Sequence, residues 1–101
     1  MNEIDFRYWL INNGVKGKIA SDTISRLKRI EKEIKNCDID EEYRSDRCTK
    51  LMSMFLNMGE NELMKEQPAC KLPVGKYYMS TYRHALKQYI TFCDFIALSK
   101  Q

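Results

Sequence analysis

Residues 77–98 read YYMSTYRHALKQYITFCDFIAL, and this stretch has the clearest helical pattern in the chain. Its apolar side chains recur every three or four residues, which is the period of one helix face. They are Tyr78, Tyr82, Ala85, Leu86, Tyr89, Cys93 and Ile96. The pattern predicts a long helix over about Tyr77–Leu98 that forms the centre of the core. Phe92 and Phe95 lie off this stripe, which favours a further packing surface at the C-terminal end of the helix.

A second helical pattern precedes it, and this one has a basic outer face. We expect the helix to begin at a cap, Ser21 or Asp22, and to run to about Lys35. Its core face consists of Ala20, Ile24, Leu27, Ile30 and Ile34. The opposite arc contains Ser21, Ser25, Lys28, Arg29, Lys32 and Lys35. This arc is either a solvated surface with charge pairs such as Lys28 with Glu31 and Arg29 with Glu33, or a binding face.

The N-terminal segment is apolar on several sides. A helix is predicted over about Glu3–Asn13, capped by Asn2 and ended by Gly14. Ile4, Tyr8 and Ile11 form one stripe, while Phe6, Trp9 and Leu10 point elsewhere. Such a helix either packs between other elements or meets a partner.

The middle of the chain predicts one longer and one shorter helix. The longer helix should begin at an Asp40 cap and run to about Met58, before Gly59. Its expected core face is Cys48, Leu51, Met52, Phe55 and Met58. A short helix over Asn61–Lys65 and a loop over Gln67–Gly75 follow, the loop because it contains two prolines and a glycine.

These patterns place the chain in the all-α class, as a single domain over residues 1–101 built from four to five helices. Its 101 residues are 44% hydrophobic and 31% charged, which is enough apolar material for one packed core. No apolar run reaches the length of a membrane span, and the acidic N-terminus lacks the order of a signal peptide. We therefore expect a cytoplasmic protein.

The residues that usually perform catalysis or bind metals are few and scattered. The cysteines, Cys37, Cys48, Cys70 and Cys93, include no CxxC pair, and His84 is the only histidine. This argues against a zinc site and favours reduced thiols in the core. Short catalytic and phosphate-loop motifs are missing too, so we expect no enzyme activity, no metal and no cofactor.

Three stretches resemble a known DNA-binding family. FRYWL at 6–10, KIASDTISRLKR at 18–29 and STYRHALKQYITF at 80–92 are similar to the opening, second and closing helices of the core-binding domain of tyrosine recombinases, the phage-integrase SAM-like fold. The resemblance implies an orthogonal helical bundle that grips one side of a DNA duplex. Nothing here corresponds to the family's separate catalytic domain, so no catalytic residue is transferred. By position, the implied DNA contacts are Ser21, Ser25, Lys28, Arg29, Lys32, Lys76, Arg83 and Lys87.

Two functions from different classes remain open at this point. The first is a non-catalytic DNA-binding module, which the formal net charge of +3 permits but does not require. The second is a protein-interaction module, such as a small regulator or inhibitor from a mobile element, that uses Phe6, Trp9, Phe92 and Phe95. Salt distinguishes them, because phosphate contacts weaken steeply as salt rises and an apolar interface does not.

Overall fold

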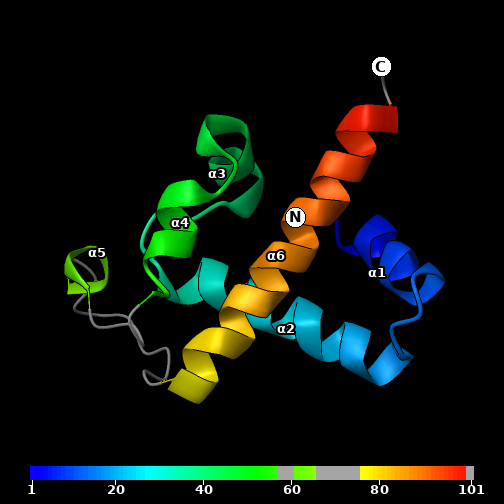
Figure 1. Ribbon diagram of the computed structural model, residues 1–101, viewed down its shortest axis with the longest axis horizontal. Helices are drawn as coiled ribbons and strands as arrows, with labels where there is room; N and C mark the ends of the chain where they lie inside the picture. The colour runs from blue at the N-terminus through cyan, green and yellow to red at the C-terminus, as the bar shows by residue number, and fades with distance from the viewer. Residues whose placement is uncertain (57–60, 66–75, 100–101) are drawn as a thin grey trace.

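A computed structural model describes residues 1–56, 61–65 and 76–99, with side chains from residue 79 onward in the last segment (Figure 1). The described segments form six helices and no strand, which confirms the predicted all-α class. The helices are α1 Glu3–Asn12, α2 Gly17–Glu33, α3 Ile39–Asp46, α4 Thr49–Ser53, α5 Glu62–Lys65 and α6 Lys76–Ser99. The predicted loop over Gln67–Gly75 and the predicted helix end at Met58 lie outside the described residues.

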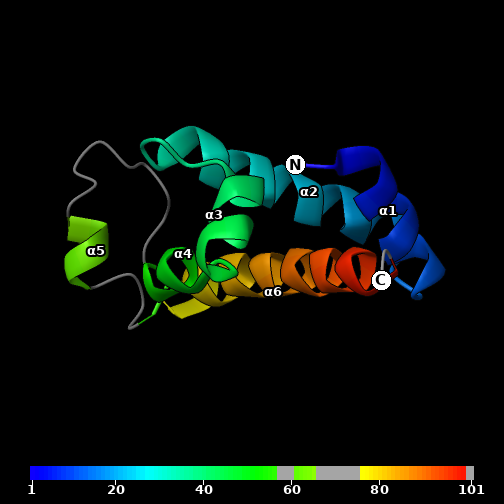
Figure 2. The same ribbon diagram turned by 90° about the horizontal axis from the view of Figure 1, so that it is seen from above.

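Helices α2 and α6 form two layers that pack against each other. In Figure 2, α2 lies on one side of the molecule and α6 on the other, while α1 closes one end and contacts both. The predicted core face of α2 is buried along its whole length, from Ala20 to Ile34. On α6, Tyr82, Leu86 and Tyr89 are buried as well. Each fully buried aliphatic side chain in this contact, such as Leu27 or Leu86, contributes about 1.5–3 kcal/mol to stability.

Helix α2 begins one turn earlier than predicted. Its N-cap is Lys16, whose carbonyl accepts a hydrogen bond of 2.9 Å from the backbone N–H of Ala20. Ser21 and Asp22 therefore lie inside the helix, and the prediction that one of them caps it is wrong. The early start places Ala20, which is fully buried, inside the helix.

Helix α1 buries a different face from the predicted stripe. Phe6 and Leu10 are fully buried, whereas Ile4, Tyr8 and Ile11 are exposed. The Phe6 ring meets Tyr89 edge-on, with 4.9 Å between the ring centroids. The pattern could not choose between these faces because apolar residues occur all around the helix.

The predicted helix from Asp40 to Met58 is broken in two. Arg47 and Cys48 adopt left-handed backbone angles, with φ of 59° and 64°, and separate α3 from α4. Such angles are uncommon for residues other than glycine, and here they accompany the complete burial of Cys48. The cap is also corrected, because the side chain of Asp38 accepts hydrogen bonds from the backbone N–H groups of Asp40 and Glu41.

Candidate nucleic-acid interface

The outer face of α2 presents a row of polar and basic side chains to solvent. Ser25, Lys28, Arg29 and Lys32 are all exposed, as the sequence predicted. They face away from α6, because the opposite face of α2 is the one buried against it. Lys35, which was predicted on the same arc, is exposed just after the helix has ended.

Sequence analysis missed one member of this row, Lys18. Because α2 begins at Gly17, the exposed Lys18 lies on the helix, two turns before Ser25 and three turns before Arg29. The row from Lys18 to Lys32 is about 21 Å long at the rise of an α-helix. The available signal was Ala20, which already belonged to the predicted core face although it precedes the predicted caps Ser21 and Asp22. We call Lys18, Ser25, Lys28, Arg29 and Lys32 the α2 outer face.

Two side chains from α1 reach the edge of this face. Glu3 Oε2 pairs with Lys28 Nζ at 2.8 Å, and the Arg7 guanidinium donates to Ser21 Oγ at 2.7 Å. The ion pair with Lys28 lowers the pKa of the Glu3 carboxyl. One of the two alternatives from the sequence paired Lys28 with Glu31, but Glu31 accepts a hydrogen bond from the backbone N–H of Ile39.

Of the three implied contacts on α6, the two with described side chains, Arg83 and Lys87, do not join the α2 outer face. Arg83 is half-buried and donates to the carbonyl oxygen of Phe55. Lys87 is exposed in a shallow depression between α6 and α4, which is also lined by Arg47 and Thr91. The side chain of Lys76 lies outside the described residues. Since α2 and α6 pack through their inner faces, their outer faces point to opposite sides of the molecule (Figure 2). The implied contacts whose side chains are described thus form two separate sets, one on α2 and one on α6.

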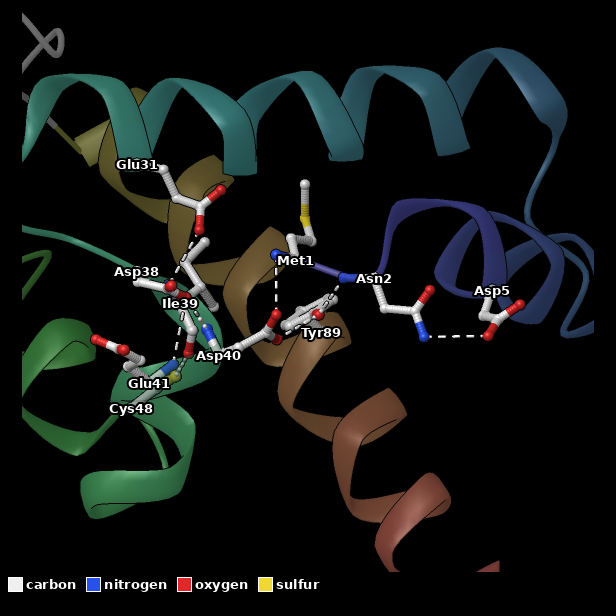
Figure 3. Close-up of polar contacts among 10 residues, drawn as sticks. All are labelled: Met1, Asn2, Asp5, Glu31, Asp38, Ile39, Asp40, Glu41, Cys48 and Tyr89. Carbon is white, nitrogen blue, oxygen red and sulfur yellow. Dashed lines mark hydrogen bonds and ion pairs between the residues drawn. The ribbon is translucent and has the colours of Figure 1, made fainter.

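A polar cluster joins the start of α1 to α3 and α6 (Figure 3). The Met1 ammonium pairs with Asp40 Oδ2 at 2.8 Å, and the Tyr89 hydroxyl donates to Asp40 Oδ1 at 2.6 Å. The same hydroxyl accepts from the backbone N–H of Asn2. Burial alone would raise the pKa of Asp40, but the two donors outweigh it and lower that pKa. All the groups of this cluster satisfy one another, which indicates a structural role rather than a reactive one.

Asp40 therefore has a different function from the one predicted. Its carboxylate holds the Met1 ammonium and Tyr89, so it does not cap α3. Its hydrogen bond to Met1 is the main cause that raises the pKa of the terminal amine. The Asn2 side chain likewise donates to Asp5 and makes no capping hydrogen bond to α1.

An apolar groove lies between α1 and the C-terminal half of α6. It has a volume of about 550 Å³, and its lining includes Tyr8, Trp9, Phe95 and Ile96. Tyr8 and Phe95 are 64% and 53% exposed. Phe6 and Phe92, which were predicted to meet a partner, are both buried, although Phe92 is among the residues that line this groove. Their rings pack together with 5.3 Å between the centroids, inside the core.

Among the described cysteines, Cys48 is buried, whereas Cys37 and Cys93 are half-buried. Burial raises the pKa of Cys37 and Cys48 to about 12 and that of Cys93 to about 11. They are free thiols, and at neutral pH they stay protonated, whereas nucleophilic attack and metal binding need the thiolate. Among the described residues, no three His, Cys, Asp or Glu side chains gather as metal ligands would. Cys70 lies outside those residues.

Comparisons with known proteins identify no relative of this chain. No family model, curated protein or solved structure matches this chain. The resemblance to recombinase core-binding domains stays a prediction from the sequence. None of the described helices has both the length and the apolar character that a membrane crossing requires.

Proposed function

We propose that this chain is a non-catalytic DNA-binding module that contacts backbone phosphates through the α2 outer face. The observation behind the proposal is the continuous exposure of Lys18, Ser25, Lys28, Arg29 and Lys32 on one side of a single helix. Lysine, arginine and serine are common donors to phosphate oxygens, and such contacts provide most of the affinity of non-specific binding. The resemblance of residues 18–29 to the second helix of core-binding domains supports the same helix.

The proposal uses α2 without α6. Lys87 lies in a separate depression between α6 and α4, so it is not part of the α2 outer face. Four cations, each meeting one phosphate of B-DNA, give a slope of about −3.6 for the logarithm of affinity against the logarithm of salt concentration. Asp22 is exposed on the same helix and reduces the local positive potential. We therefore expect weak binding by the isolated module.

Fluorescence anisotropy of a labelled duplex, in a series of salt concentrations, tests the proposal. Changing Arg29 and Lys32 to glutamate should weaken binding at low salt by more than tenfold and reduce the slope by about two. The matched control changes Arg44 and Lys50 to glutamate, which alters the net charge equally but on α3 and α4, where both side chains are exposed. Equal losses in the two variants would contradict a site on α2, and so would wild-type binding that does not depend on salt.

A second candidate, protein interaction, is favoured by the apolar groove between α1 and α6. Tyr8 and Phe95 expose more than half of their surface there, and Leu98 is 68% exposed near the end of α6. Exposed apolar groups that gather in a groove are typical of protein contacts. A pull-down that persists at high salt and is lost when Tyr8 and Phe95 are changed to alanine would support it. Capture that disappears at high salt would argue against it.

A further inference from the structure

Four side chains form a ladder across the edge between α1 and α2. Ser21 and Lys28 lie on one side of α2, and Glu3 and Arg7 lie one turn apart on α1. The contacts run from Ser21 to Arg7, from Arg7 to Glu3 at 3.9 Å, and from Glu3 to Lys28 at 2.8 Å. The Glu3 carboxylate therefore sits between two cations that come from different helices.

This arrangement has the chemistry of an oxyanion site. A guanidinium and an ammonium offer several donors to one anion, and the Ser21 hydroxyl keeps the guanidinium oriented. The site is open to solvent, because the side chains of Arg7, Glu3 and Lys28 are 38%, 36% and 56% exposed. It also adjoins the α2 outer face, to which Lys28 belongs. A phosphate of a duplex lying on that face thus meets this edge.

We propose that Arg7, Ser21 and Lys28 form a binding site for a DNA backbone phosphate, and that the Glu3 carboxylate occupies its anion position in the free protein. This site rests on the proposed function of the α2 outer face and extends it onto α1. Glu3 acts as an internal competitor of the phosphate. Its pair with Lys28 is solvent-exposed, and exposed pairs of this kind are weak enough for a phosphate to displace them.

The displaced Glu3 keeps a favourable position. It belongs to the first turn of α1, where a negative charge interacts with the positive end of the helix dipole without needing Lys28. Arg7 keeps its hydrogen bond to Ser21 during the exchange, so one cation of the site is already in place. The exchange needs only a rotation of the Glu3 side chain.

The test is a cycle of variants in the anisotropy assay. Glu3→Gln removes the competitor, so it should tighten DNA binding at low salt by about threefold to fivefold and steepen the salt slope by about one unit. In the Lys28→Gln background the same change should have a much smaller effect, because Glu3 acts through Lys28. Arg7→Gln in the Glu3→Gln background should weaken binding. Thermal melting of each variant checks that the fold is kept.

Asp22→Asn is the matched control. It removes one negative charge from an exposed residue of α2 outside this ladder. An equal gain from Asp22→Asn, or a Glu3→Gln gain that persists in the Lys28→Gln background, would show general electrostatics and overturn the phosphate site. Binding that needs Arg29 and Lys32 but ignores Glu3→Gln would overturn the site alone and leave the proposed function in place. Absence of binding by both the wild type and Glu3→Gln would overturn both.

Discussion

Helices α1 and α2 pack against the same core, yet they expose opposite chemistry. Helix α1 turns Ile4, Tyr8 and Ile11 outward, while α2 turns Ser25, Arg29 and other polar residues outward. For α2 the exposed face follows from its sequence pattern, because all its aliphatic residues except Ile19 are on the buried side. For α1 it follows from tertiary contacts. The difference shows that the exposed face of a helix can follow from its own sequence pattern, as in α2, or from the tertiary contacts that select the buried face, as in α1.

An aromatic cluster around Phe6 holds α1 against the core. Phe6 contacts the rings of Trp9, Tyr89 and Phe92 and is fully buried. The start of the helix is held in addition by the Met1 ammonium and Asp40. Two such anchors explain how α1 stays in place although much of its apolar surface meets water.

The largest expected effect is a difference in stability between substitutions on the buried face of α1 and substitutions on its exposed face. Phe6→Ala should destabilise the fold by about 3–5 kcal/mol, because it opens a cavity in the aromatic cluster. Tyr8→Ala, at an exposed position of the same helix, should change the free energy of unfolding by about 0.5 kcal/mol or less. Urea denaturation of both variants measures this. Similar losses would mean that the outer face of α1 is part of the core.

An intermediate effect concerns the terminal amine. Acetylation of Met1 removes its charge, so it should destabilise the fold by about 1 kcal/mol at neutral pH. The folded state raises the pKa of this amine above 8.0, so its contribution is complete below pH 8.0 and is lost as pH rises through the folded value. The stability difference between free and acetylated chains should therefore shrink on the alkaline side. Thermal melting across that range measures it, and a difference that does not depend on pH would contradict the ion pair.

At low pH, the stability that the same cluster contributes depends on the ionisation of Asp40. Its pKa is lowered below 3.8 in the folded state, so its contribution is present above that pH and is lost as pH falls through the folded value. The variant Asp40→Asn should remove this acid-side loss. It also leaves the Met1 ammonium without its partner, so it serves as a control for the acetylated chain.

The smallest expected effect is on the outer face of α2. Changing Arg29 and Lys32 to glutamate should alter the free energy of unfolding by about 0.5 kcal/mol or less for each residue, because both side chains are exposed. The same variant should lose most DNA binding. Urea denaturation beside the binding assay checks both. A large loss of stability would mean that this face serves the fold, and the comparison with α1 would fail.

The sequence predicted most of the helices and much of the core. It did not predict the contacts between residues that are far apart in the chain. The core face of α2 was correct because one apolar face dominates that helix, whereas on α6 Phe92 was placed off the stripe although it is buried. The break at Arg47 and Cys48 was missed because no glycine or proline marks it, and both residues adopt left-handed angles that are uncommon for their types. The function of Asp40 was missed as well, since its partners Met1 and Tyr89 are far away in sequence.

The candidate site was predicted in part for the same reason. The exposed residues of α2 could be found from the helical period alone. Lys18 and Arg7 could not be assigned to the site, because the first depends on where α2 begins and the second on how α1 packs beside it. The division between the α2 and α6 residues required the layer arrangement. A local sequence pattern can identify the exposed face of one helix. Only the packing of the helices shows which exposed faces lie close enough to form one site.

The most direct test of the central claim is to map the backbone amides that respond to duplex DNA by NMR. We expect the largest chemical-shift changes along α2 from Lys18 to Lys32, with smaller ones at Glu3 and Arg7. Chemical-shift changes around Lys87 on α6, or in the groove near Phe95, without changes along α2 would contradict DNA binding through the α2 outer face.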